Sequence, residues 1–213
     1  MIPFSLNNYT SQESQKLTFL DPHKYVTLKY TQLFTSSIAT TVGTQQVFNL
    51  NGCFDPDRTG GGHQPYGWDT LTTLYSAYRP LHARWKVEFG TQPVTYSCLA
   101  IPTNSQPAVT ITTAATFQTV AEMPRAVVKV QGGTGAPTEV INGQINLWEL
   151  AGVTQVEYLA NQNYEALINA NPTEELCLTI GFYNTGASTT AVSATVTLWY
   201  TVDLHDPIAL GGS

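Results

Sequence analysis

The sequence predicts an all-β domain, and three observations support this expectation. Segments in which apolar and polar residues alternate recur along the chain, and this is the period of a strand with one buried face. Clusters of Gly, Pro and Asn separate these segments. Only 11 % of the 213 residues are charged, which is less than half of the roughly one quarter that is typical. Neutral polar residues take their place, and such surfaces suit strands better than ion-paired helices.

Eight segments carry a strand pattern. In the clearest, Ala83, Trp85 and Val87 fall on one face, whereas His82, Arg84 and Lys86 fall on the other. The last segment places a row of six apolar residues on one face. The expected strands are residues 24–34, 45–52, 80–89, 94–101, 125–131, 139–148, 176–183 and 190–204.

Two longer connections interrupt the strands, at residues 54–78 and at about 151–175. In the first, the spacing of Leu71, Leu74, Tyr75 and Tyr78 predicts one apolar face of a short helix between the second and third strands. Asp69 would lie in its first turn and Pro80 would end it. We expect Trp68, Tyr75 and Tyr78 to be core residues.

The chain reads as a single domain. No repeat or shift in composition marks a boundary within residues 24–207. Residues 1–23 are expected to form a flexible or extended N-terminal segment, and residues 208–213 a tail. The sequence shows no signal peptide and no run of 18 apolar residues, so we expect no membrane partner.

The titratable residues do not suggest catalysis. Cys53, Cys98 and Cys177 are few and far apart, which is typical of small buried side chains. The four histidines are isolated in the sequence, and no spaced set of His, Cys or Glu predicts zinc or a nucleophile. An enzyme on this scaffold is therefore not expected.

The charge distribution argues against strong nucleic-acid binding. The net charge is −6, and all nine Lys and Arg residues lie at or before Lys129. His82, Arg84 and Lys86 nevertheless form a basic row on one strand face. This row is either an ordinary solvated face or a weak phosphate-facing patch.

Asp55 and Asp57 flank Pro56 and have two interpretations. Asp and Pro favour turns, so the pair can be a turn-capping element. Alternatively, carboxylates from two chains could share a calcium ion. No other cofactor is expected.

A specific resemblance enters with the stretch FDPDRTGGGHQPYGWDTLTTLYSAYRPLHARWKVEF, residues 54–89. It resembles the capsid proteins of small circular single-stranded DNA viruses that encode a replication protein, and the related shell domains of small plant RNA viruses. The resemblance extends from Lys24 to Pro207. The matching residues in this stretch are Asp55, Pro56, Asp57, Gly62, His63, Gln64, Pro65, Gly67, Asp69, Leu74, Tyr75 and Tyr78.

This resemblance implies an eight-stranded antiparallel jelly-roll sandwich. The first, eighth, third and sixth strands would form one sheet, and the second, seventh, fourth and fifth the other. It also implies a coat protein of the virion that assembles with about sixty copies of itself, or a multiple, into an icosahedral shell. The 54–78 loop would fix the chain or form a subunit interface through Asp55, Asp57, His63, Gln64, Pro65, Gly67 and Asp69.

One departure concerns the genome. Such capsid proteins usually begin with an Arg-rich arm, whereas Lys16 is the only basic residue before Lys24. We therefore expect contacts with single-stranded nucleic acid to be weak. The alternative function is a carbohydrate-binding or adhesion module that uses Trp148, Trp199 or Tyr183.

Overall fold

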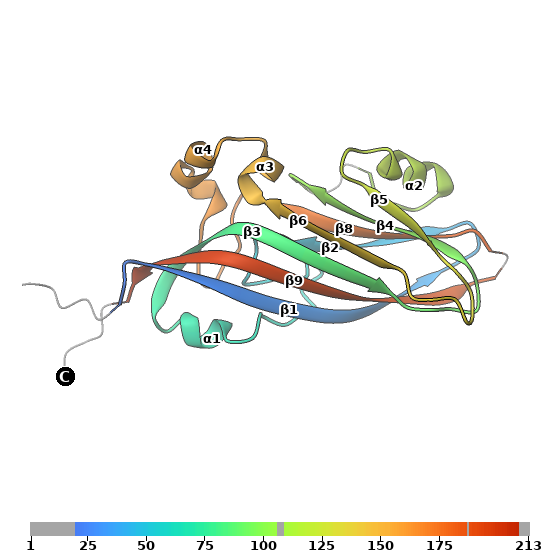
Figure 1. Cartoon of the computed structure of the whole chain (residues 1–213), viewed down its shortest axis with the longest axis horizontal. Helices are drawn as coiled ribbons and strands as arrows, with labels where there is room; N and C mark the ends of the chain where they lie inside the picture. Colours follow the sequence, from blue (N-terminus) through green and yellow to red (C-terminus); the bar gives the residue numbers. More distant parts are fainter. Residues whose placement is uncertain (1–19, 106–108, 187, 209–213) are drawn as a thin grey trace, which may run out of the picture.

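The computed structural model describes residues 20–105, 109–186 and 188–208. These residues form two antiparallel sheets, in the orders β1-β9-β3-β6 and β2-β8-β4-β5 (Figure 1). This is the predicted jelly-roll pairing, which is confirmed. The strands are β1 (His23–Ile38), β2 (Gly43–Asn49), β3 (Tyr75–Phe89), β4 (Tyr96–Thr103), β5 (Val127–Gln131), β6 (Val140–Asn146), β8 (Cys177–Asn184) and β9 (Thr190–Pro207).

Most of the strands bury one face against the other sheet. The predicted apolar row of β9, from Val192 to Val202 in steps of two, is buried throughout. Aromatic rings meet between the sheets, where Phe182 contacts Phe34 and Phe89. The three cysteines are buried and unpaired, as expected.

The helix predicted within the 54–78 loop is present, but its predicted extent is wrong. Helix α1 (Trp68–Leu71) is a single turn, and Tyr75 already begins β3. Strand pairing overrides the helical spacing here, because Tyr75 lies opposite Pro207 of β9. Tyr78 is a core residue, as expected, but it belongs to β3 and its hydroxyl donates to the Ala170 carbonyl at 2.9 Å.

Pro80 therefore lies inside a strand and does not end a helix. A shift in register between Pro80 and His82 marks a β-bulge in β3. Proline cannot donate to a strand ladder, so a bulge is one of the few places in a sheet that accepts it.

The connections between strands contain short elements that the sequence did not predict. The strand expected to reach Trp148 ends at Asn146, because Leu147 and Leu150 are buried on one side of a helix instead. A two-residue strand, β7 (Ala166–Leu167), pairs with β3. The helices are α2 (Ala114–Ala121), α3 (Leu147–Ala151), α4 (Gln155–Ala160) and the 3-10 turn η1 (Gln162–Tyr164). No helix of the described residues is long and apolar enough to cross a membrane.

Gly143 has a packing role in β6. It lies opposite Trp85 in the ladder between β3 and β6. A Cβ atom at this position would lie 2.1 Å from Cζ2 of the Trp85 indole, so the ring occupies the space of the missing side chain. The glycine that weakens the strand pattern is thus required by a core tryptophan.

We predict that Gly143→Ala lowers the free energy of unfolding by about 1–3 kcal/mol, because the indole must move to relieve an overpacked contact. Chemical denaturation monitored by tryptophan fluorescence measures this change. Gly61→Ala is the matched control, since its nearest atom would lie 3.6 Å away in ordinary contact. Equal stability of the two variants would contradict this explanation.

Candidate functional site

The outer face of the β1-β9-β3-β6 sheet carries a row of polar and aromatic side chains. The register places Lys29 of β1 opposite Trp199 of β9, and Trp199 opposite Arg84 of β3. Arg84 in turn lies opposite Gln144 of β6. In Figure 1 these four strands cross the view in front of β2 and β8. One row therefore spans four strands on the face away from the core.

Trp199 and Arg84 are stacked. The guanidinium carbon of Arg84 lies 4.2 Å from the Trp199 ring centroid, and Nζ of Lys29 lies 5.9 Å from it. Attraction between a cation and an aromatic ring is strongest for tryptophan. The stack holds the guanidinium against the sheet while its hydrogen-bond donors remain available at the surface.

The two cationic side chains of β3 on this face, Arg84 and Lys86, differ in whether an acidic residue pairs with them. Lys86 pairs with Glu88 at 2.8 Å. Within the described ranges, no acidic side chain forms an ion pair with Arg84. Burial, together with the positive charge of Arg84, lowers the pKa of His82 and so favours its neutral form. The positive charge of the face at neutral pH thus comes from Lys29, Arg84 and Lys86.

The surface on both sides of Arg84 is hollowed. One hollow lies toward Lys86 and Asn142, and the other toward His82 and Thr27. Arg84, Gln144 and Trp199 line both. The predicted row of His82, Arg84 and Lys86 does share one face, and its chemistry suits a phosphate beside a flat ring. No sequence pattern connects this row with Trp199, although both lie on polar strand faces.

The 54–78 loop is anchored by a buried carboxylate. Asp57 is only 1 % exposed. Its two oxygens accept hydrogen bonds from the amides of Gln32 and Gln46, both at 2.6 Å. The backbone amide and hydroxyl of Thr59 also donate to it, at 3.0 and 2.8 Å. Both carboxylate oxygens therefore have partners within the chain.

The other predicted loop residues lie around this anchor without forming a single pocket. Asp55 is half-buried, and burial, followed by the nearby Asp57 charge, raises the pKa of its carboxyl group. The exposed His63 ring packs edge-on against Tyr30 at 4.8 Å between centroids. Gln64 is half-buried, Pro65 is buried, and Gly67 and Asp69 are exposed at the start of α1. Calcium binding by Asp55 and Asp57 stays a prediction.

Gly67 has a conformational role. Its φ of 84° lies in the left-handed region, at the residue that precedes α1. Glycine adopts this conformation without steric cost, unlike other residues. Trp68, next to it, is buried and packs edge-on against Tyr78. The loop motif thus turns the chain so that an indole enters the core.

A cluster of potential metal ligands lies elsewhere. In the described part of the chain, His23, Asp203 and His205 form the group whose ligand atoms lie close enough for one ion. In the sequence these histidines are isolated from one another. Only the pairing of β1 with β9 brings them together, so no local motif could have identified them.

The three aromatic residues of the carbohydrate hypothesis do not form one platform. Trp148 lies on α3 and packs partly against the core. Tyr183 lies on β8 of the other sheet and contacts Phe117 of α2. Only Trp199 belongs to the outer face described above.

Comparison with known proteins supports the architecture. No family model matches the sequence, and no curated protein matches it. The solved structure of mud crab tombus-like virus has a TM-score of 0.52 at 11 % identity, covering 98 % of this chain and 93 % of that one. The structure of Desmodium yellow mottle tymovirus has a TM-score of 0.51 at 12 % identity, covering 100 % of this chain and 97 % of that one. The structure of Macrobrachium rosenbergii nodavirus has a TM-score of 0.50 at 9 % identity, covering 100 % of this chain and 62 % of that one. At these identities the likeness shows the shared jelly-roll fold.

We predict that Asp57→Asn lowers the free energy of unfolding by about 2–3 kcal/mol, because the new amide group would face the donors that Asp57 now satisfies. Thermal unfolding followed by circular dichroism measures this loss. Asp206→Asn is the control: Asp206 is exposed with a φ of 55°, which asparagine tolerates. A loss no larger than in this control would contradict the anchoring role of Asp57.

Proposed function

We propose that this chain is a viral coat protein that assembles with copies of itself into a closed icosahedral shell. Its jelly roll matches that of the three viral structures over nearly its whole length. The DPD and GHQPYGWD motifs favour the finer assignment to small circular single-stranded DNA viruses. Such a chain acts by binding its neighbours, without catalysis, and is located in the virion.

The observation that carries this proposal is the distribution of exposed apolar side chains. On β5, an edge strand, Val127, Val128 and Val130 are all exposed. Other exposed apolar residues lie on separate parts of the surface, on β1, in the 54–78 loop, on α4 and on β7. They include Tyr25, Leu33, Tyr66, Val156, Leu159 and Leu167.

This distribution is what a shell subunit requires. An exposed apolar edge strand is an aggregation hazard unless a partner covers it. A monomeric binding module needs one such surface, whereas a subunit surrounded by copies needs several. The low charge of the chain also limits repulsion between copies.

The motif loop contributes to assembly by holding its shape. We infer that the Asp57 hydrogen bonds and the Gly67 turn fix the loop, so that the fully exposed Tyr66 is presented to a neighbouring copy. His63, Gln64, Pro65 and Asp69 belong to the same loop.

A weaker partner is single-stranded nucleic acid, bound on the outer sheet face. Arg84, Lys86 and Lys29 supply the charge, and the stacked pair of Arg84 and Trp199 supplies a flat surface for a base. With few cations on this face, affinity would be modest and sensitive to salt.

We predict that Val130→Asp prevents assembly and leaves a folded monomer. Val130 is 58 % exposed, so the substitution costs little in the isolated chain but places a charge in a buried contact. Sedimentation velocity measures the particle fraction, and circular dichroism reports folding. Val130→Thr, which keeps the shape without the charge, should still assemble. Particles of normal size from Val130→Asp would rule out β5 as a contact.

We predict that the double variant Arg84→Ala, Lys86→Ala reduces the nucleic acid retained by purified particles, measured as the 260/280 nm absorbance ratio. Two phosphate-facing charges would be lost, so short oligonucleotides should also bind with a shallower salt dependence. Lys129→Ala, which removes one positive charge from the other sheet, is the comparison for the single variants Arg84→Ala and Lys86→Ala. An unchanged ratio in the double variant would show that nucleic acid does not contact this face.

A further inference from the structure

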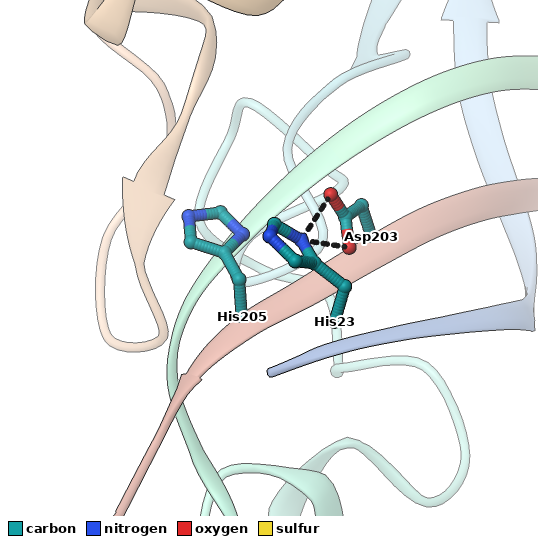
Figure 2. A group of neighbouring side chains, drawn as sticks. All are labelled: His23, Asp203 and His205. Carbon is teal, nitrogen blue, oxygen red and sulfur yellow. Dashed lines mark hydrogen bonds and ion pairs between the residues drawn. The ribbon is translucent and has the colours of Figure 1, made fainter. Parts of the chain in front are cut away.

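A compact group of histidine and carboxylate side chains lies at one end of the outer face. It follows from the register of two strands. His23 at the start of β1 lies opposite His205 near the end of β9. Asp203 precedes His205 by two residues and so points to the same face. Figure 2 shows the three side chains side by side, with their polar atoms turned toward one another.

The distances are short enough for a common ligand. Nδ1 of His23 lies 3.1 and 3.0 Å from the two oxygens of Asp203. The two imidazole centroids are 5.8 Å apart. One ligand atom from each residue can be chosen so that all lie within 4.8 Å of one another.

Each histidine has one ring nitrogen close to a carboxylate. Asp203, which is 5 % exposed, accepts from Nδ1 of His23, so Nε2 of that ring carries the lone pair in the neutral form. Nε2 of His205 lies 3.5 Å from Oε2 of Glu165. The remaining nitrogen of His205, Nδ1, is on the side of its ring that faces His23 in Figure 2.

That nitrogen is a buried polar atom without a partner. His205 is 9 % exposed, and its Nδ1 has no hydrogen-bond partner among the described residues. Buried polar atoms are nearly always satisfied by protein, water or an ion. An unpaired lone pair aimed at a second imidazole and a carboxylate is the arrangement that a metal ion would complete.

We propose that His23, His205 and Asp203 bind a divalent transition-metal ion, with zinc as the expected occupant. Two imidazole nitrogens favour zinc and its neighbours over calcium or magnesium, which prefer oxygen ligands. Carboxylates that hold the second nitrogen of a ligating histidine fix its tautomer and orientation. Glu165, 3.5 Å from Nε2 of His205, is placed to give this support to His205. Both oxygens of Asp203 lie near Nδ1 of His23, so one can stay with that ring while the other ligates the ion.

The surroundings permit this ion. Bonds of about 2.1 Å in a tetrahedral site place ligand atoms roughly 3.4 Å apart, so the cluster must contract slightly. The His23 side chain is 58 % exposed at the beginning of β1 and has room to move. Arg79 lines the same hollow, but its guanidinium pairs with Glu165 and donates to the Leu159 carbonyl. A bound ion would link the beginning of β1 to the end of β9.

Zinc binding to the full chain tests this proposal, by competition with a chromophoric chelator. We expect one ion per chain, and at least a tenfold loss of affinity in His23→Gln and in His205→Gln. His63→Gln removes an exposed histidine of the 54–78 loop and should bind zinc as the unmodified chain does. Calcium in large excess should not displace the zinc. Absence of stoichiometric binding, or equal affinity in all three variants, would overturn the assignment.

A second measurement protects the test against misfolding. His23 is largely exposed, so His23→Gln should keep the circular dichroism spectrum of the unmodified chain. The zinc affinity of this variant therefore decides the test even if His205→Gln fails to fold. Cobalt(II) bound to the unmodified chain should show visible absorption typical of nitrogen and oxygen ligands, and His23→Gln should weaken it. Zinc should raise the melting temperature of the unmodified chain but not of this variant. A melting temperature that zinc raises equally in both would place the ion elsewhere.

Discussion

The register of β9 between β1 and β3 is the constraint on which the rest of the structure depends. Successive residues of a strand point to opposite faces, so one register decides both faces at once. On the inner face it aligns the buried row from Val192 to Val202. On the outer face it brings Trp199 between Lys29 and Arg84 and places His205 opposite His23. A slip of one residue would expose the core row and disperse both outer groups.

Much of the fold could be predicted from the sequence because strand periodicity is a local signal. The alternation around Trp85 identified β3, its inner face and its basic outer row. Where tertiary pairing decides, local spacing was misleading: Tyr75 and Tyr78 have a helical separation but pair in β3. Helix α4 did carry a usable signal, since Thr154 and Glu157 form a capping box. The two-residue β7 has no pattern long enough to recognise.

The candidate sites divide in the same way. Residues on one strand, such as Arg84 and Lys86, could be grouped from sequence, whereas their stacking partner Trp199 comes from another strand. His23 and His205 lie near opposite ends of the sequence and meet only through long-range pairing. The role of Asp57 could be predicted only in part. Its place in a turn motif is a local sequence feature, whereas its hydrogen bond from the distant Gln32 amide depends on the fold.

The proposed assembly would link these features to function, because exposed valines on an edge strand and a neutral polar surface suit repeated contacts between copies of one chain. Electron microscopy of the purified chain, at a concentration and ionic strength close to physiological, tests this claim most directly. The account predicts closed particles of uniform diameter with icosahedral symmetry, in which β5 and the 54–78 loop lie between subunits. A stable monomer under all conditions tried, including high protein concentration, would contradict it.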